Sequence, residues 1–306
     1  MPETPISSRA AGTPTPPPNT GPGSRLAVRK TYKLFINGAF PRSESGRSYS
    51  VKAADGRWLA NAAHASRKDV RDSVVAARGA LAGWNGATAY NRGQVLYRVA
   101  EVLEGRAAQF AAEVAAAEGI TGARSRRTVA AAIDRWVWYA GWADKFAQVV
   151  GNANPVAGPY FNFSVPEPMG VVAVIAPPAS SLLGLVSVVA PVIVTGNTAV
   201  IVASEERPLP AVSLTEVLAT SDLPAGVVNL LTGPVPELAK VLAAHMDVDA
   251  MDLTGAPPDD RADLERAAAA NLKRLLVLEE DWTSAPGIRR MRGFVETKTV
   301  WHPLGL

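Results

Sequence analysis

The sequence predicts an α/β protein in which a parallel sheet is covered by helices on both faces. From Val171 to Leu278, short apolar segments alternate with segments whose apolar residues recur at helical spacing. Two of the apolar segments, Val171–Ala176 and Thr198–Val202, are nearly continuous aliphatic runs, which is typical of strands buried on both faces. This alternation indicates a Rossmann-type architecture, and such sheets bind ligands beyond the carboxyl ends of their strands.

The first half of the chain is predicted to be mainly helical after a short β region. Lys33–Phe40 is predicted as a strand that contains a tight Asn-Gly turn, and Ser48–Lys52 as a second strand. Ser66 with Asp69 three positions later has the spacing of a capping box, which predicts a helix start. The apolar residues then recur at helical spacing in four segments, so we predict four helices: Val70–Leu81, Asn91–Glu104, Ala107–Glu118 and Ser125–Ala147.

In the second half, strands and short helices are predicted to alternate after a strand at Tyr160–Val165. The strands are Gly170–Ala176, Thr198–Val202, Val227–Thr232, Ala250–Leu253 and Leu275–Leu278. The helices between them are Leu182–Thr195, Pro210–Thr220, Pro236–Ala244 and Asp260–Ala270. Parallel neighbouring strands need such crossover connections, so the pattern supports a parallel sheet.

Charge and composition narrow the classes of function. The chain has 306 residues and a formal net charge of +3, and its basic residues are spread out, so nucleic-acid binding is not expected. The most apolar stretch, 171–202, is interrupted by three prolines, and no membrane span is expected. The first residues lack an apolar secretory signal and the chain has no cysteine, so we expect a cytoplasmic protein.

Several segments, in order from about residue 33 to 278, resemble motifs of the aldehyde dehydrogenases. They are Phe35–Gly38, Trp138–Lys145, Glu167–Val172, Gly196–Thr198, Ser204-Glu205, Leu223–Asn229 and Leu253–Gly255. The resemblance implies the family's cofactor-binding domain, NAD(P) as cofactor, and oxidation of an aldehyde through a cysteine thiolate. Because this sequence contains no cysteine, the nucleophile that the family uses is not present in it.

The resemblance also predicts the domain organisation. Residues 293–303 are similar to the family's C-terminal oligomerisation strand, which in the family follows a whole catalytic domain, but here they follow the last predicted sheet strand almost directly. We therefore expect most of the catalytic domain to be missing. The predicted units are a disordered Pro/Thr-rich tail at 1–27, a cofactor-binding domain at 28–282 with an oligomerisation hairpin inserted at 156–168, and a linker with the C-terminal strand at 283–306.

The catalytic positions implied by the resemblance are altered. Ala179 stands where the family has its oxyanion-hole asparagine, and a methyl group cannot donate a hydrogen bond. Val277 stands in direct register with the general-base glutamate, and Glu279 matches it only if the alignment slips by two positions. No catalytic residue is therefore assigned. Ser180-Ser181 is a further candidate nucleophile with no partnered histidine in evidence, and the histidines lack metal-type spacing.

Four residues match the family's cofactor-binding motifs, namely Pro177, Glu205, Gly233 and Gly255. The family's ribose-binding lysine is replaced by Val202. The helix-opening turn that faces the diphosphate in the family is here Gly255-Ala256-Pro257-Pro258-Asp259-Asp260, where the prolines supply no N–H donors. Our hypothesis is that an aspartate caps this helix and takes the anion's place, so that NAD(P) binding is weak or lost.

Two functions from different classes are compatible with these residues. The first is a non-catalytic structural or regulatory subunit that pairs with itself or with a full-length aldehyde dehydrogenase through the strand edges at Tyr160–Glu167 and Phe294–Trp301. The second is an NAD(P)-dependent oxidoreductase acting on an aldehyde, with the thiol supplied by a partner chain. A decaying gene product is a third possibility. Trp282 with Arg289, Arg290 and Arg292 forms either a small binding patch or, as we favour, a solvated basic linker.

Overall fold

The computed structural model describes residues 29–305, so the predicted tail at 1–27 lies outside the described residues. Its centre is a parallel sheet of five strands in the order β10-β9-β6-β7-β8. The strands are β6 (Val171–Ile175), β7 (Thr198–Val202), β8 (Val228–Leu231), β9 (Ala250–Asp252) and β10 (Arg274–Leu276). The chain moves outward from β6 to β8 and then returns to the other side of β6, which makes a doubly wound sheet and confirms the predicted fold class.

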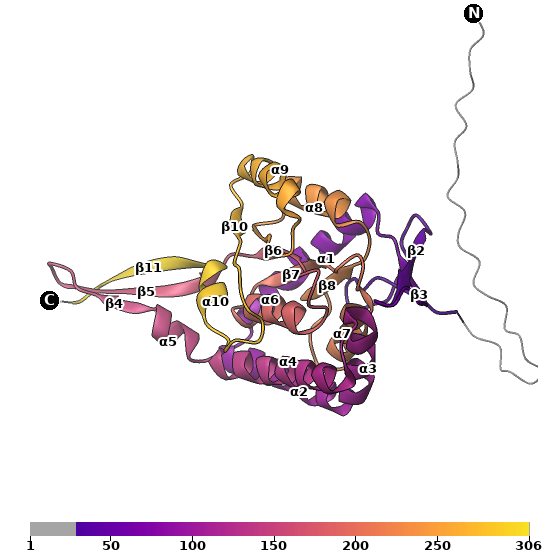
Figure 1. Ribbon diagram of the computed structural model, residues 1–306. Helices are drawn as coiled ribbons and strands as arrows, with labels where there is room; N and C mark the ends of the chain where they lie inside the picture. Colours follow the sequence, from indigo (N-terminus) through magenta and orange to yellow (C-terminus); the bar gives the residue numbers. More distant parts are fainter. Residues whose placement is uncertain (1–28, 306) are drawn as a thin grey trace, which may run out of the picture.

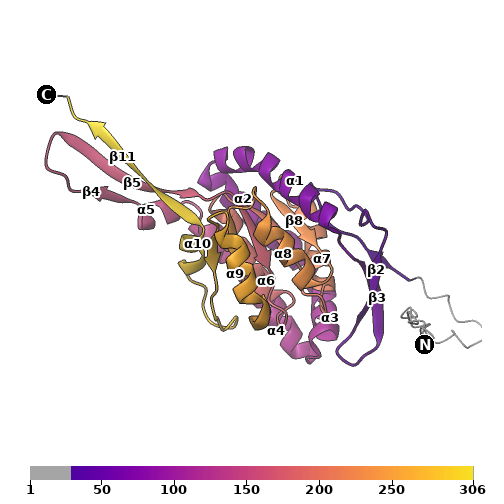
Figure 2. The same cartoon turned by 90° about the horizontal axis from the view of Figure 1, so that it is seen from above.

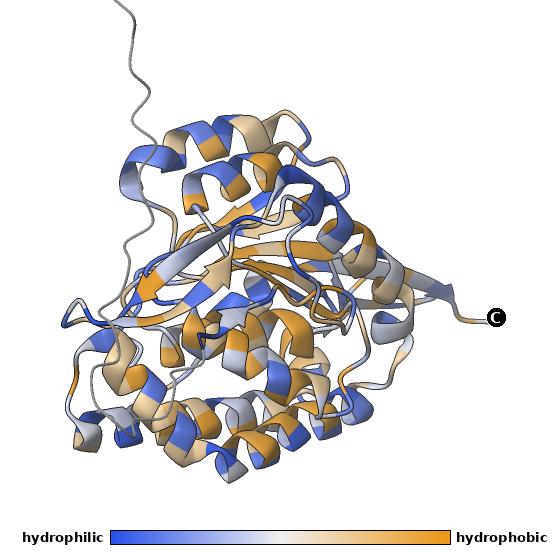
Figure 3. Cartoon of the chain, turned by 90° about the vertical axis from the view of Figure 1, so that its right-hand side faces the viewer, coloured by the Kyte–Doolittle hydropathy of each residue, from blue (hydrophilic) through white to orange (hydrophobic). Residues whose placement is uncertain are grey.

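Helices cover both faces of this sheet (Figure 1). Alternate residues of β6 face opposite cores, because Val171, Ala173 and Ile175 belong to one apolar cluster and Val172 and Val174 to the other. One face packs against α1 (Arg67–Gly86), α8 (Val235–Ala244) and α9 (Pro258–Ala269). The other packs against α6 (Leu183–Val194) and α7 (Leu209–Ala219), with α2 (Ala89–Gly105), α3 (Ala107–Glu118) and α4 (Gly122–Trp142) as an outer layer. Figure 3 shows the apolar strands enclosed between these layers.

The predicted start of α1 is confirmed in its details. The Ser66 hydroxyl accepts a hydrogen bond from the Asp69 amide at 3.3 Å, and the Asp69 carboxylate accepts one from the Ser66 amide at 2.7 Å. The predicted helix Ser125–Ala147 is wrong in its length, because α4 ends at Trp142 and a separate short helix, α5 (Phe146–Val150), follows. Between them the amides of Ala143 and Lys145 bond three residues back, to Ala140 and Trp142, so the α-helical ladder is interrupted. Among residues 29–305, no helix is both long and apolar enough to cross a membrane.

The N-terminal β region differs from its prediction. A small sheet in the order β1-β3-β2 contains β1 (Thr31–Tyr32), β2 (Ser48–Lys52) and β3 (Trp58–Ala63), of which β3 was not predicted. Lys33–Phe40 is not a continuous strand. Instead Phe35 forms a single antiparallel bridge to Leu230 at the edge of the central sheet, and a turn at Asn37 and Gly38 reverses the chain. The turn is confirmed, and the reversal at Asn37 and Gly38 divides the predicted strand. The Asn37 amide bonds to the Asn229 side chain at 2.9 Å.

A three-stranded antiparallel arm projects from the body, at the opposite end of the molecule from β2 and β3 (Figures 1 and 2). It consists of β4 (Asn152–Asn154), β5 (Tyr160–Pro168) and β11 (Val295–Pro303) in the order β11-β5-β4. The β11–β5 pairing runs continuously from Val295 opposite Pro168 to Pro303 opposite Tyr160. β5 and β11 were predicted as strands, whereas β4 was not. A short helix, α10 (Arg289–Gly293), precedes β11 and lies beside α6.

Candidate functional site

The carboxyl edge of the central sheet collects the catalytic and cofactor-binding positions that the sequence analysis named. Parallel strands end at the same edge, so the loops that follow them share one surface. The β6 loop brings Pro177 and Ala179, the β7 loop Glu205, the β8 loop Gly233, the β9 loop Gly255 and the segment after β10 Glu279. The order of the strands changes direction between β6 and β9, so the topological switch point lies between the Pro177 and Gly255 loops.

The β6 and β7 loops are tied to each other rather than open to a ligand. The Ser204 hydroxyl donates to the Pro178 carbonyl at 3.4 Å, and an Arg207 N–H donates to the Ala179 carbonyl at 3.0 Å. The Ala179 methyl group is exposed and offers no donor. The Ser181 hydroxyl and amide both donate to the Glu118 carboxylate at 2.7 Å. This carboxylate therefore anchors the loop, and Ser181 is engaged by it rather than by a histidine base.

Glu205 is exposed on the rim of a hollow of about 640 Å³ that is also lined by Tyr49, Lys52 and Arg207. Burial raises the pKa of the Tyr49 phenol strongly, and the charge of Glu205 raises it further. The Glu205 carboxylate could therefore accept hydrogen bonds from the hydroxyl groups of a ligand in this hollow. Val202 is fully buried in β7 and contributes no charge there. The hollow thus keeps the Glu205 acceptor, and its cations are Lys52 and Arg207 rather than a residue at position 202.

The two predicted cofactor glycines are each required by the backbone. Gly233 has a φ of +142°, and a Cβ at this position would lie 3.3 Å from the Ala65 amide nitrogen. Gly255 is more constrained, since a Cβ there would lie 2.2 Å from the Ala176 carbonyl oxygen. Its own amide donates to the Ile175 carbonyl at 3.2 Å. The backbones of the β6 and β9 loops are therefore in direct contact at the switch point.

The turn between β9 and α9 does not fit a diphosphate group. Pro257 and Pro258 have no N–H, and the amides of Ala256 and Asp260 already donate to the carbonyls of Leu253 (2.9 Å) and Pro257 (3.1 Å). An anion site at a helix N-terminus needs free backbone amides. Asp259 and Asp260 add two negative side chains to the same first turn. These carboxylates would repel a diphosphate group.

The hypothesis that an aspartate caps α9 is wrong. The cap residue is Pro257, and within the described residues no side chain makes a capping hydrogen bond to this helix. The helix begins at Pro258 because a proline is preorganised for the first helical position. Asp259 and Asp260 therefore lie inside the first turn, where their charges interact favourably with the helix dipole without accepting a capping bond.

The main feature that the sequence analysis missed is a buried ion cluster at this edge. Arg290, on α10, has a side chain that is only 1% exposed and pairs with the fully buried Asp252 at the end of β9. The same guanidinium donates to Glu280 at 2.7 Å and to the Thr254 hydroxyl at 3.2 Å. Burial disfavours its charge, but the two carboxylates outweigh this and raise the pKa of Arg290.

This cluster corrects the interpretation of residues 289–292 as a solvated basic linker. Arg289 and Arg292 are exposed, but Arg290 is buried beneath Trp282, whose ring centre lies 6.0 Å from its guanidinium carbon. One signal in the sequence pointed to it, namely Asp252 inside an otherwise apolar strand. A charged residue in such a strand requires a buried partner of opposite charge.

A second arginine fixes the segment that follows β10. Arg135, on α4, donates to the Ser187 hydroxyl at 2.8 Å and to the carbonyls of Trp282 and Ser284 at 2.9 and 3.0 Å. Burial lowers the pKa of its guanidinium. The space left between this loop and α4 is a cavity of about 120 Å³. Glu279 is exposed beside this segment, and no hydrogen bond of its side chain is found in the described part of the chain. The loop is thus held closed over the edge by Arg135 and Arg290.

Comparisons with known proteins agree with this architecture. Human retinal dehydrogenase 2 is 32% identical over 271 residues, which cover 86% of this chain and 50% of that protein. An aldehyde dehydrogenase of Alternaria alternata is 33% identical over 245 residues, covering 79% and 49%. Among solved structures, HpcC from Thermus thermophilus superposes with a TM-score of 0.76 at 32% identity, covering 80% of this chain and 47% of that one.

The NAD⁺ complex of an aldehyde dehydrogenase from Bacillus cereus superposes with a TM-score of 0.75 at 25% identity, covering 80% of this chain and 50% of that one. The chain therefore spans about half the length of the relatives that it matches. The sequence model of the Aldehyde dehydrogenase family matches residues 40–279, which include every strand of the central sheet. This chain belongs to the aldehyde dehydrogenase family.

Proposed function

We propose that this chain is a non-catalytic member of the aldehyde dehydrogenase family, acting in the cytoplasm as a structural or regulatory subunit of an oligomer. The observation that carries the proposal is the ion cluster that closes the β9–β10 side of the carboxyl edge. There Arg290 joins Asp252 and Glu280 from the segments that end β9 and follow β10. A family member that works on a ligand at this edge needs donors facing outward, whereas these groups satisfy one another.

The absence of the family's reacting groups also supports a non-catalytic role. The 306-residue sequence contains no cysteine, and within the described residues Ser181 at the edge is bonded to a glutamate rather than to a histidine base. Ala179 stands at the oxyanion position with a methyl group, and removing one oxyanion donor costs about 2.7–4 kcal/mol of transition-state stabilisation. In the phosphate-facing turn two prolines have no N–H and the amides of Ala256 and Asp260 are already bonded, so we infer that NAD(P) binding is weak or lost.

The arm supports the subunit role. β11 and β4 are the outer strands of the arm, and outer strands carry unpaired backbone groups that can pair with another chain. Tyr160, Phe161 and Trp301 are exposed near its tip, where aromatic side chains favour association. We propose that residues 28–282 form the cofactor-type domain and that the hairpin at 156–168 and the segment 283–306 serve oligomerisation, with a second copy or a full-length aldehyde dehydrogenase as partner.

Glu205 favours one alternative. It keeps an exposed carboxylate on the rim of the hollow beside β7, where the family binds the adenosine ribose. In this alternative the chain is an NAD(P)-dependent oxidoreductase acting on the aldehyde group of its substrate, with the thiol supplied by a partner chain. The retained carboxylate supports residual cofactor binding, although it does not replace the missing donors at α9.

Native mass spectrometry of this chain, co-expressed with a full-length aldehyde dehydrogenase from the same genome and supplied with NAD, distinguishes the two proposals. The non-catalytic subunit predicts mixed or homomeric oligomers in which NAD is carried only by full-length subunits. A homo-oligomer of this chain that carries NAD itself would favour the alternative. A monomer that ignores the co-expressed enzyme would contradict both.

A further inference from the structure

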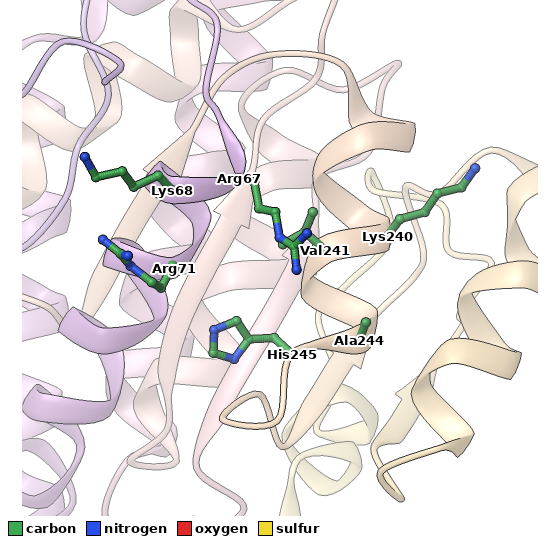
Figure 4. A pocket seen from close by; sticks show the side chains of 7 residues that line it. All are labelled: Arg67, Lys68, Arg71, Lys240, Val241, Ala244 and His245. Atoms are coloured by element: carbon green, nitrogen blue, oxygen red, sulfur yellow. The ribbon is translucent and has the colours of Figure 1, made fainter. Parts of the chain in front are cut away.

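A groove of about 710 Å³ lies between the first turns of α1 and the second half of α8, and it shares no residue with the carboxyl edge described above. Its α1 wall carries Arg67, Lys68 and Arg71, and its α8 wall consists of Val241 and Ala244, with His245 at the end of the helix. Figure 4 shows Arg67 reaching toward Val241 and the His245 ring extending toward α1 below Arg71, while Lys240 points away from the other side chains.

The positive charge of the α1 wall is only partly compensated within residues 29–305. Arg67 and Arg71 are four residues apart on one helix, where like charges destabilise each other, and basic residues in a first turn oppose the helix dipole. Lys68 pairs with Glu44 at 3.3 Å and Arg71 with Asp72 at 2.7 Å. Arg67 forms no ion pair with any residue in 29–305. The groove therefore retains positive charge that a bound anion would compensate.

His245 adds a fixed hydrogen-bond donor. Its Nδ1 accepts the Asp247 amide N–H at 3.2 Å, so the neutral ring carries its proton on Nε2. Burial lowers the pKa of His245, and this outweighs the opposing charge of Asp247. The Lys273 ammonium also donates to the His245 carbonyl at 2.6 Å, which holds this end of α8 in place. The groove thus combines guanidinium donors on its α1 wall with an imidazole donor and apolar side chains on its α8 wall.

We propose that this groove binds a small organic phosphate, with the phosphate between Arg67, Arg71 and His245 and the apolar part of the molecule against Val241 and Ala244. The planar guanidinium group matches phosphate oxygens in pairs and supplies charge-assisted hydrogen bonds. A volume of about 710 Å³ lies in the range of small-molecule sites, which are about 300–1,000 Å³. The apolar wall distinguishes an organic phosphate from the inorganic ion.

Calorimetric titration of the full chain with phenyl phosphate, inorganic phosphate and phenol tests both halves of this proposal. Phenyl phosphate should bind most tightly, inorganic phosphate at least fivefold more weakly, and phenol without measurable heat. Equal affinity for the two phosphates would overturn the assignment to an organic ligand. The absence of phenyl phosphate binding at millimolar concentration would overturn the site itself.

The double variant Arg67→Gln/Arg71→Gln should weaken phenyl phosphate binding at least tenfold. Arg124→Gln/Arg127→Gln is the matched control, because it removes the same charge from exposed positions near the start of another helix, α4. The control should bind within twofold of the unchanged chain. An equal loss in both variants would reveal attraction by net charge alone and would overturn the proposal. Circular dichroism and thermal unfolding verify that each variant is folded. The affinity for phenyl phosphate does not depend on whether NAD binds at the carboxyl edge, because the groove shares no residue with that edge.

Discussion

The carboxyl edge of the central sheet and the three-stranded arm each contain an arginine or lysine paired with a carboxylate, but in opposite surroundings. At the edge, the Arg290 and Asp252 side chains are 1% and 0% exposed. In the arm, the Lys298 and Glu167 side chains, 2.9 Å apart, are 58% and 48% exposed. Breaking a buried pair leaves a charge without solvent, whereas an exposed charge is rehydrated. The charged groups of Arg290 and Asp252 at the edge are thus buried and paired with each other, while the arm leaves its charged groups and aromatic rings exposed to solvent.

The largest effect is expected from Arg290→Met, which leaves Asp252 unpaired in the core. The free energy of unfolding should fall by about 3–5 kcal/mol, as measured by urea denaturation, because an unpaired buried charge is strongly destabilising. Asp252→Asn combined with Arg290→Met should recover part of this loss, since both charges are then removed. A loss below about 1 kcal/mol in the single variant would mean that the edge is not closed by this cluster, and the contrast with the arm would disappear.

The arm should respond in association rather than in folding. Trp301, in β11, is 58% exposed and packs its ring 5.8 Å from that of Tyr160. Trp301→Glu should abolish oligomers in sedimentation or native mass spectrometry, while the unfolding free energy of the monomer changes by only about 0.5 kcal/mol, as at other surface sites. Val75→Glu, at a residue of α1 that is 61% exposed, is the matched control and should leave association unchanged. Oligomers that persist in Trp301→Glu would argue against the arm tip as an interface.

The same contrast explains which parts of the molecule the sequence could predict. The strands β6 and β7 are nearly continuous apolar runs and the cap of α1 is a local pattern, so both are visible in a single stretch of sequence. β3 escaped because Trp58–Ala63 contains small alanines that hide its alternation. The Arg290 cluster escaped because its partners are distant in the chain, with Asp252 lying 38 residues away. Asp252 alone hinted at a buried cation, and only the folded chain identifies which arginine supplies it.

Lys273 lies just before β10, at the edge of the central sheet opposite to the Arg290 cluster, and its buried charge is expected to lower the stability of the fold. Burial lowers the pKa of Lys273 from 10.5 to about 8, against the smaller opposing effect of Asp249 and Asp247. Between pH 8 and 10.5 the Lys273 side chain is protonated in the unfolded chain and largely neutral in the folded chain. The free energy of unfolding therefore rises as the pH is raised from about 8 to 10.5, and this gain is lost again as the pH falls through about 8. The stability advantage of the unchanged chain over Lys273→Met should therefore grow as the pH is raised from about 7 to about 9.5. Lys240→Met, at an exposed residue of α8, is the control for the removal of one positive charge from the surface.

The smallest effect is expected from Lys298→Gln in the arm. Its ammonium contacts Glu167 at 2.9 Å, a distance comparable to the 2.7 Å between Arg290 and Glu280 at the edge. Because both arm groups are solvated and screened, the free energy of unfolding should change by no more than about 0.5 kcal/mol in urea denaturation. A loss as large as that of Arg290→Met would mean that the arm pair is desolvated in the native assembly. The change in unfolding free energy caused by Lys298→Gln should therefore be measured at protein concentrations above and below the association midpoint. A larger change at the higher concentration would indicate that a partner chain covers β11.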